Sequence, residues 1–390
     1  MGCGSSGQRL RILSIHWGIT IGGVGKYAAS IDDVSKYAPI DIQTICILCP
    51  SWHCDRSTLA KLSAKEIVIK SRFDFSWVWQ LSREIERIKP NLIMTHGFNG
   101  HFITMVMDII CRHPVKKICS YHGQYHAPKK NRKSFEKPFD LMTEYFIRHR
   151  VVSVVSVAEY CKEYLVQRRV NPDKIKVIHN GIDDLFVPPK KARRQLRDEW
   201  GVKDDEILLG VASRLDPVKG ISHLISAFEQ AIRHINNLRL VIAGTGTLNN
   251  TLKRRVDEIG LSRRIVFAGF RSDVNDCLSA FDIFVLPSLA EYHSIALLEA
   301  MRAKKAIIAT NVGGNSESVR HEREAILIPP ANTDSLAKAI ERLSTNPTMR
   351  TKLATAAYKR FQQEFTTEQM VHRTADWILR CGSPLTPIRN

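Results

Sequence analysis

The sequence of 390 residues contains no apolar run of the roughly 18 residues that a membrane-spanning helix requires. The N-terminus also lacks the apolar stretch and small-residue cleavage site of a secretory signal peptide. Nine cysteines, an odd number, are scattered along the chain, which argues against a disulfide framework and for a reducing compartment. Met1–Ser6 fits an N-myristoylation pattern, for which a short leader without lipid is the preferred alternative. We therefore expect a cytoplasmic protein.

Two ligand-binding motifs are incomplete. Cys46 and Cys49 have the spacing of a zinc-ligand pair, but no second CxxC pair exists, and Cys46 lies in an apolar run typical of a buried strand. The segment Thr20–Tyr27 is similar to a P-loop, but Thr20 replaces the first glycine and Tyr27 replaces the Ser or Thr that binds magnesium. It does not fit the GxGxxG pattern of nicotinamide-binding proteins either. We therefore expect no metal site and no nucleotide cofactor.

The charge balance is unusual, because 57 Lys and Arg against 39 Asp and Glu give a net charge of +18. Such an excess favours an anionic partner, which can be nucleic acid, a phosphate-bearing small molecule or an acidic membrane surface. The alternative is a basic surface that only aids solubility. Since no recognisable DNA- or RNA-binding motif is present, we do not expect a nucleic-acid partner.

Short apolar runs alternate with amphipathic segments in both halves of the chain, which predicts βα units around parallel sheets. The predicted strands of the first half are Leu10–Ile15, Ile42–Leu48, Ile67–Ile69, Leu92–Thr95, Lys117–Tyr121, Val151–Val157 and Lys176–Ile178. Those of the second half are Ile207–Ala212, Leu238–Ala243, Ile265–Ala268, Ile283–Leu286, Ala306–Ala309 and Ala325–Ile328. The fold class is therefore α/β, with two doubly wound, Rossmann-like domains.

A Pro-rich, charged break near residues 183–205 separates the halves. We place the N-terminal domain at 1–185 and the C-terminal domain at 186–364, and expect the C-terminal helix, about 365–390, to pack back on the N-terminal domain. Two such domains facing each other would form a deep cleft at the carboxyl ends of both sheets, where ligands bind in these folds.

The segment after the strand Ile283–Leu286 predicts an anion site. Ser294 is suited to cap a helix that begins at Ile295, which leaves free N–H groups for a phosphate. Glu291 lies before that helix start and Glu299 within the helix, so the two carboxylates can bind hydroxyls on either side of a diphosphate. The alternative is a capped surface helix with two solvated glutamates.

Other strand ends carry further candidates. Arg214 follows the strand Ile207–Ala212, and Lys219 is expected to open the next helix, so both cations can meet one anion. Gly246 lies in a Gly-rich turn after the next strand, where small residues let the backbone approach a ligand closely. In the first half, His96 and His122 each follow a strand and can serve the cleft, although a lone histidine there is more often structural.

Two turns of the first half complete the set. Gly22 and Gly23 can bring backbone N–H groups against a phosphate or sugar, with a tight strand–helix turn as the alternative. Asn180 precedes a glycine in a turn at the expected mouth of the cleft.

Together these residues resemble a known family. Glu291…Glu299 resembles the E-x7-E motif of retaining glycosyltransferases with the GT-B fold, in particular glycosyltransferase family 4. The remaining matching motifs run in the family's order over nearly the whole chain, and they are Gly22-Gly23, Asn180–Asp183, Ser213-Arg214, Lys219-Gly220, Gly244-x-Gly246 and Val266–Phe270.

The resemblance implies roles for the candidates. Arg214 and Lys219 neutralise the donor diphosphate, Glu299 binds the donor ribose and Glu291 touches the donor sugar. The backbone at Ser294 and Ile295 forms the phosphate site. On the donor side, the resemblance also places Gly23 beside the diphosphate, Gly246 in the donor-binding loop, and Gly269 and Arg271 beside the nucleobase. His122 is placed beside the reacting carbon of the donor sugar. The positions implied on the acceptor side are Gly22, His96 and Asn180.

The resemblance thus implies a retaining, metal-independent hexosyltransferase without a cofactor, using a nucleotide-sugar donor. The acceptor is a glycan or a lipid-linked saccharide in cell-surface polysaccharide, lipopolysaccharide or glycoconjugate synthesis. Alternatives on the same fold are a nucleotide-sugar 2-epimerase and a non-catalytic nucleotide-sugar-binding partner subunit. Tyr292 and His293 depart from the family's usual Gly-Phe-Gly, so we expect them to reshape the sugar pocket.

A basic segment precedes the helical pattern Leu141–Arg150. Four cations within five residues lie next to the aromatic residues Phe135 and Phe139, which predicts peripheral attachment to an anionic membrane on its inner face, with a solvated loop as the alternative. These cations are Lys129, Lys130, Arg132 and Lys133.

Overall fold

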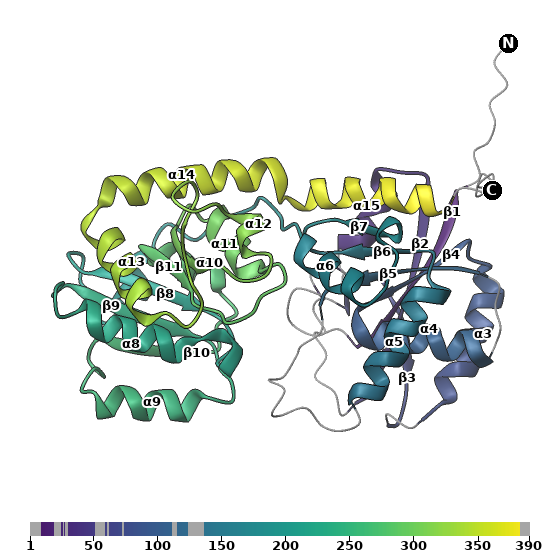
Figure 1. The fold of residues 1–390 in the computed structure, drawn as a ribbon, viewed down its shortest axis with the longest axis horizontal. Coiled ribbons are helices and arrows are strands. Elements are labelled where there is room, and N and C mark those ends of the chain that lie inside the picture. The colour runs from purple at the N-terminus through teal and green to yellow at the C-terminus, as the bar shows by residue number, and fades with distance from the viewer. Residues whose placement is uncertain are drawn as a thin grey trace, which may run out of the picture. The chain divides into compact units, whose positions relative to one another are not determined.

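The computed structural model describes residues 9–18, 25, 27, 30–50, 59–60, 62–71, 74–110, 115–123 and 136–382. The chain divides into two compact α/β units (Figure 1). Unit 1 comprises Met1–Gly181 with Thr367–Asn390, and unit 2 comprises Ile182–Thr366. The first boundary thus lies four residues before the one expected at 185.

Unit 1 contains a parallel sheet of seven strands in the order β3-β2-β1-β4-β5-β6-β7. The strands are β1 Leu10–Trp17, β2 Ile40–Leu48, β3 Lys65–Val68, β4 Leu92–His96, β5 Lys116–Tyr121, β6 Ser153–Ser156 and β7 Ile175–Val177. The strand order reverses between β1 and β4, which is the place where ligands bind in doubly wound sheets.

Helices flank the unit 1 sheet, so its central strands are buried on both faces and consist mainly of apolar residues. The described helices are η1 Asp32–Lys36, α3 Ser76–Ile88, α4 Gly97–Ile110, α5 Glu136–Arg150, α6 Glu159–Gln167, η3 Pro172–Lys174 and α15 Thr367–Gly382. Met370 and Ile378 of α15 pack with Ile12 of β1 in one apolar cluster, and Trp377 Nε1 donates to Ser153 Oγ at 2.8 Å. The C-terminal helix therefore belongs to the core of unit 1.

Unit 2 contains a parallel sheet of six strands in the order β10-β9-β8-β11-β12-β13, which reverses between β8 and β11. The strands are β8 Ile207–Ala212, β9 Leu238–Ala243, β10 Ile265–Gly269, β11 Ile283–Leu286, β12 Ala306–Thr310 and β13 Ile326–Ile328. The helices are α7 Ala192–Glu199, η4 Pro217–Lys219, α8 Ile221–Ala231, α9 Asn249–Glu258, α10 Val274–Ala280, α11 Ile295–Arg302, α12 Asn315–Ser318, α13 Thr333–Thr345 and α14 Pro347–Glu364. One apolar cluster covers each face of the sheet.

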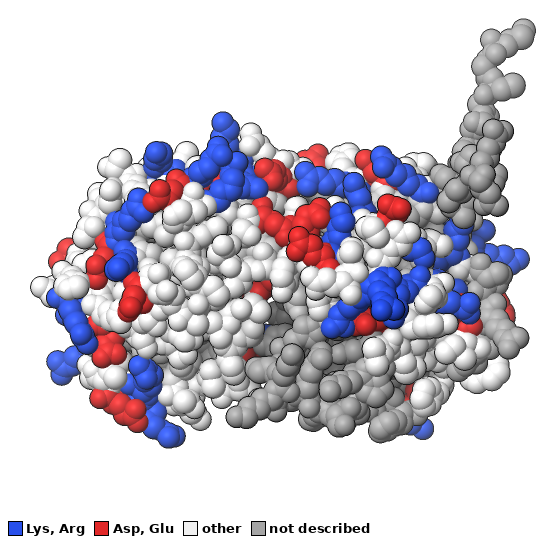
Figure 2. Space-filling model, viewed as in Figure 1, with Lys and Arg blue, Asp and Glu red and all other residues white. Residues whose placement is uncertain are grey.

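The strand pattern agrees closely with the sequence. All thirteen predicted strands are present, and each end lies within two residues of its expected place. In the part of the chain that the structure describes, no helix has the length and apolar character to cross a membrane. On the face shown in Figure 2, Lys and Arg side chains along α14 and α15 are interspersed with Asp and Glu.

Candidate functional site

The loops that follow four neighbouring strands of unit 2 are bonded to one another. Ser213 N, after β8, donates to Ala243 O at 3.0 Å, and Gly244 N, after β9, donates to Gly269 O at 2.6 Å. Leu289 N, after β11, donates to Val218 O at 2.7 Å. These bonds hold the carboxyl ends of β8, β9, β10 and β11 in one surface, at the reversal of strand order.

Glycine is required in this surface because backbone meets backbone. A Cβ on Gly244, whose φ is +140°, would lie 1.8 Å from Ser213 O, and one on Gly220, whose φ is +64°, would lie 2.0 Å from Pro287 O. A Cβ on Gly246 would lie 2.6 Å from the backbone of Leu215. The close backbone approach at these glycines is therefore between neighbouring loops, whereas the sequence predicts approach to a ligand.

An ion pair joins two of the predicted residues across the β8–β11 junction. Lys219 Nζ lies 2.6 Å from Glu291 Oε1, and the Ser288 hydroxyl donates to the same oxygen at 2.7 Å. The Lys219 side chain is 18% exposed and that of Glu291 is 10% exposed. Lys219 lies in the 3-10 turn η4, whereas α8 begins at Ile221, so the prediction that Lys219 opens the helix is wrong.

Arg214 is the more accessible cation of this junction. Its Nη1 lies 2.7 Å from Asp216 Oδ2, while the side chain remains 60% exposed. Asp216 also accepts a hydrogen bond from the Thr247 hydroxyl at 3.2 Å, which ties it to the loop after β9. The guanidinium is therefore anchored by Asp216, while more than half of the side chain is exposed to solvent.

Helix α11 begins as the sequence predicts. Ser294 is its N-cap in extended conformation, and its hydroxyl accepts from Leu297 N at 3.4 Å. The first helical residue is Ile295, so its free N–H groups lie after β11, beside the loop that carries Glu291. Glu299 lies further along α11 and is half-buried.

His293 lies inside unit 2. The residue is buried, its Nε2 lies 3.2 Å from Ser318 Oγ, and its ring centroid lies 5.5 Å from that of Phe365. Tyr292 is only half-buried. The side chain of His293 is therefore packed in the core. Of the two residues that depart from the family motif, only Tyr292 has a partly exposed surface that a ligand can contact.

Arg271 is held by carboxylates. Its Nε and Nη2 donate to Asp273 at 2.8 and 2.5 Å, and its Nη1 donates to Glu199 at 3.0 Å. The hydrogen bonds to Asp273 raise the pKa of Arg271 and lower that of Asp273. Gly269 precedes it in left-handed conformation, with a φ of +68°. Because Asp273 lies only two residues after Arg271, this ion pair could have been predicted from the sequence.

Unit 1 brings His96 and His122 together at the ends of β4 and β5, and adds His16 at the end of β1. The rings of His16 and His96 are stacked, with centroids 4.3 Å apart and an interplanar angle of 2°. Ser120 Oγ lies 2.9 Å from both His96 Nδ1 and His122 Nε2. Burial lowers the pKa of His16 to about 3, with a smaller contribution from His122, and burial lowers the pKa of His122 to about 4.

The remaining predicted residues lie elsewhere. Asn180 is buried at the end of unit 1, and the next backbone N–H, of Gly181, donates to Met370 Sδ of α15 at 3.1 Å. Cys46 is buried in β2, as its apolar run predicts. Gly22, Gly23 and the four cations of residues 129–133 lie outside the described residues.

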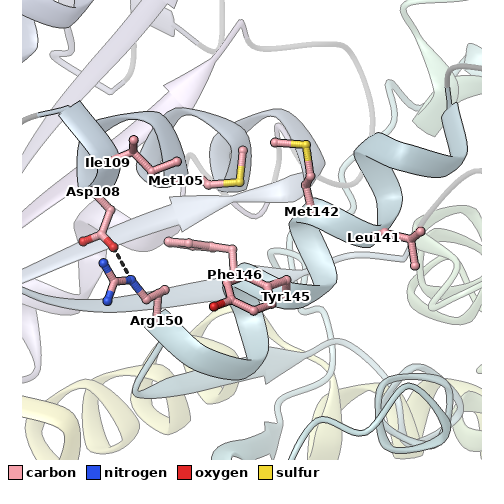
Figure 3. A pocket seen from close by; sticks show the side chains of 8 residues that line it. All are labelled: Met105, Asp108, Ile109, Leu141, Met142, Tyr145, Phe146 and Arg150. Atoms are coloured by element: carbon pink, nitrogen blue, oxygen red, sulfur yellow. Dashed lines mark hydrogen bonds and ion pairs between the residues drawn. The ribbon is translucent and has the colours of Figure 1, made fainter.

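A pocket of about 520 Å³ lies between α4 and α5 of unit 1 (Figure 3). Met105, Met142 and Phe146 line it, and the ion pair of Asp108 with Arg150, 2.5 Å long, closes one end. Its rim is apolar and exposed, with Ile109 at 64%, Leu141 at 61% and Tyr145 at 59% exposure.

Comparison with known proteins gives consistent matches. The family model for Glycosyl transferases group 1 matches residues 192–360, and the model for Glycosyltransferase Family 4 matches residues 63–184. An uncharacterised glycosyltransferase of Methanocaldococcus jannaschii is 27% identical over 315 residues, which cover 77% of this chain and 80% of that protein. The UDP-Gal:alpha-D-GlcNAc-diphosphoundecaprenol alpha-1,3-galactosyltransferase of Escherichia coli is 27% identical over 280 residues, or 70% of each chain.

Solved structures share the fold. The crystal structure of HepE from Anabaena in complex with UDP has a TM-score of 0.81 at 19% identity, covering 95% of this chain and 100% of that one. The sucrose-phosphate synthase of Thermosynechococcus elongatus has a TM-score of 0.77 at 19% identity, with 95% and 99% covered.

Proposed function

Because the chain belongs to the group 1 glycosyltransferases of family 4, enzymes with the GT-B fold, we propose that it transfers a hexose from a nucleoside diphosphate donor with retention of configuration and without a metal ion. The observation that carries the proposal is the cation set at the β8–β11 junction. Lys219 is paired there with Glu291 in the loop before α11, and Arg214, paired with Asp216, follows β8.

These groups match the charge that glycosyl transfer generates. As the glycosidic bond breaks, the departing nucleoside diphosphate accumulates negative charge, and fixed cations and N–H dipoles lower the barrier there. Lys219 and Arg214 supply the cations, and Ser294 caps the helix that supplies the dipoles. Glu299 on α11 is assigned to the ribose hydroxyls and Glu291 to the sugar.

A ligand screen tests the donor assignment directly. The melting temperature of the protein is measured with UDP, GDP, ADP and their common sugars, since a ligand that binds only the folded state raises it. We expect one nucleotide to raise the melting temperature of the wild type and of Lys352→Ala, an exposed lysine of α14, and to have little effect on Lys219→Ala. Absence of any shift, or an equal shift in Lys219→Ala, contradicts the proposal.

We further propose that the acceptor is a glycan or a lipid-linked saccharide at the inner face of an anionic membrane. The apolar rim of the α4–α5 pocket supports this, because Ile109, Leu141 and Tyr145 offer exposed surface for shallow insertion beside the basic end of α5, Arg148–Arg150. The Escherichia coli relative, whose name gives a GlcNAc-diphosphoundecaprenol as its acceptor, points to the same chemistry.

Sedimentation with liposomes of anionic and of neutral lipids tests the membrane part. We expect binding to anionic vesicles that salt weakens and that Leu141→Gln reduces. Val187→Gln, at an even more exposed apolar residue of unit 2, should leave binding unchanged. A variant with Lys129, Lys130, Arg132 and Lys133 changed to Gln should lose binding. Binding that ignores both salt and these substitutions contradicts the membrane proposal.

A further inference from the structure

A continuous chain of hydrogen bonds crosses the reversal point of the unit 1 sheet. His16 Nε2 lies 3.0 Å from Ser14 Oγ, and Ser14 Oγ lies 3.0 Å from His96 Nε2. The chain continues from His96 Nδ1 to Ser120 Oγ at 2.9 Å and from Ser120 Oγ to His122 Nε2 at 2.9 Å. Five side chains from β1, β4 and the end of β5 are thus linked in one row of hydrogen bonds. We call this row the file, and its members in order are His16, Ser14, His96, Ser120 and His122.

Because of the two serines, the hydrogen bonds of this file must all be donated in a consistent direction. Ser14 and Ser120 are both fully buried, and among the described residues the hydrogen-bond partners of their hydroxyls are the rings on either side. A hydroxyl has one proton, so each serine donates to one ring and accepts from the other. A neutral imidazole likewise donates through one nitrogen and accepts through the other.

With the central ring of His96 neutral as well, only two arrangements satisfy every link. In the first, the protons point toward His122: His16 Nε2 donates, His122 Nε2 accepts, and Nδ1 of His122 carries a proton. In the second, all directions are reversed, and Nδ1 of His16 carries the proton instead. The low pKa values of His16 and His122 keep both rings neutral near pH 7, which these arrangements require. A mixed arrangement leaves a buried polar atom without a partner, at a cost of about 1–3 kcal/mol.

We infer that Ser14, His96 and Ser120 are positioning residues that set the tautomer of His122, so that one and only one of the two outer Nδ1 atoms, on His16 or on His122, is protonated. Resting on the proposed function, the inference assigns Nδ1 of His122 to a sugar hydroxyl, because Nε2 is occupied by Ser120. The ring of Tyr27 holds His122 from the side, edge to face, with centroids 4.7 Å apart. The half-buried imidazole is thereby fixed in orientation, and its proton position is coupled to that of His16.

Nitrogen NMR of protein labelled with 15N-histidine tests the coupling without any turnover. We expect one dominant tautomer for His122 and the opposite one for His16. Ser14→Ala, a position bonded to His16 and His96, should convert His122 to a mixture of tautomers, and Ser14→Thr should restore the single form. Ser156→Ala is the matched control, since Ser156 is equally buried on β6 but donates to Ala158 O. The same Nδ1 state on both rings, or an effect of Ser156→Ala equal to that of Ser14→Ala, overturns the inference.

Kinetics then test the link to transfer. Ser14→Ala and Ser120→Ala should each lower kcat about tenfold and leave the KM for the donor within about twofold, which corresponds to ~1.4 kcal/mol in the barrier. Ser14→Thr should recover most of the rate. A changed tautomer with unchanged kcat overturns the assignment to the substrate. Absence of transfer with every donor, together with the expected NMR result, overturns the proposed function and leaves the tautomer coupling standing.

Discussion

At the reversal of strand order in unit 1 the structure places three imidazoles and two hydroxyls, whereas at the same position in unit 2 it places Lys219, Arg214 and their carboxylate partners. The unit 1 set carries no formal charge near pH 7 at His16 or His122, because burial lowers both pKa values. The unit 2 set is ionic. One architecture thus holds two kinds of polar site at equivalent places.

The difference follows from what burial costs. A file of neutral hydrogen bonds is stable inside a sheet provided every member is satisfied. A buried ion pair is stable only while both partners are present, since an unpaired buried charge costs about 3–5 kcal/mol. A diphosphate can replace or join Glu291 at Lys219, so the ionic unit is suited to an anion. The neutral unit is suited to hydroxyl groups and to fixed proton positions.

The largest effect is expected from removing the cations of unit 2. Lys219→Ala and Arg214→Ala should each lower kcat/KM by about 10²–10³-fold, ~3–4 kcal/mol, because they remove stabilisation of leaving-group charge. Steady-state kinetics with the donor identified by the ligand screen give the values. Arg194→Ala, an exposed cation of α7 at 88% exposure, is the control and should retain wild-type activity.

A comparable loss in Arg194→Ala would show that net charge alone matters. Wild-type turnover in both Lys219→Ala and Arg214→Ala would contradict the diphosphate assignment. Circular dichroism of each variant separates these outcomes from unfolding.

Acid should weaken unit 1 before unit 2. His16 and His122 have folded pKa values of about 3 and 4, below the ordinary value of 6.5, so the unfolded chain binds more protons between pH 6.5 and 4 and stability falls as pH falls. Asp32, whose pKa burial raises to about 6, opposes them, because its protonated form is stabilised in the fold. From pH 6.5 to pH 5 the net loss should be about 2 kcal/mol.

Hydrogen exchange resolves the two units in one measurement. Peptides from β1, β4 and β5 should lose protection over this range after correction for intrinsic rates, and peptides from β8 and β11 should not. In unit 2, Asp282 and Lys305 titrate outside the range, since the pKa of Asp282 is lowered and that of Lys305 is about 8. Asp32→Asn removes the opposing contribution of Asp32. In this variant the stability that unit 1 loses between pH 6.5 and pH 5 should therefore increase to about 3 kcal/mol. Equal losses in both units would contradict the comparison.

The sheets were predictable because their signals are local. Parallel strands buried on both faces read as short apolar runs, and helices between them read with a period of 3.6. The same holds for the cap of α11, where Ser294 and the apolar helix that follows lie within a few residues of each other. The thirteen strands and the start of α11 needed no knowledge of distant contacts.

The polar contacts were less predictable because they depend on which strands are neighbours. Lys219 and Glu291 are 72 residues apart and meet only because β8 and β11 pair. The role of Gly244 was likewise hidden, since the backbone that it touches is that of Ser213. Predicting either contact would have required the order of the strands in the sheet.

The file of unit 1 corresponds to a pattern in the amino-acid sequence that we did not identify from the sequence alone. Ser14 and His16 are two residues apart, as are Ser120 and His122, so each pair lies on one face of its strand. The repeated Ser-x-His at the ends of two strands, together with His96 at the end of a third, indicates a shared polar cluster. Recognising it required that β1, β4 and β5 be adjacent.

A smaller effect, of opposite sign, is expected when the carboxylate of unit 2 is neutralised. Glu291→Gln keeps the size of the side chain but removes the charge that pairs with Lys219. A bare nucleoside diphosphate should then bind about fivefold more tightly, ~1 kcal/mol, while sugar transfer falls. Isothermal titration calorimetry measures the affinity, and Glu206→Gln, which loses a different ion pair of unit 2 with Arg239, is the control. Weaker binding in Glu291→Gln would indicate that the glutamate itself contacts the nucleotide.

The smallest effect is expected from a chelator. If the ionic unit supplies its own positive charge, EDTA should leave kcat and KM unchanged, because Lys219 and Arg214 already meet the diphosphate. Three carboxylates after the strands of this unit already hold cations: Glu291 pairs with Lys219, Asp216 with Arg214 and Asp273 with Arg271. A divalent ion bridging these groups to the diphosphate would have to displace those cations, and manganese would then restore activity after EDTA. Turnover is therefore measured after EDTA treatment, and again with added magnesium or manganese, in the wild type and in Lys219→Ala. Loss of activity in the wild type that manganese reverses would contradict catalysis by side-chain cations, and partial rescue of Lys219→Ala alone would support it, since the metal then replaces the missing charge.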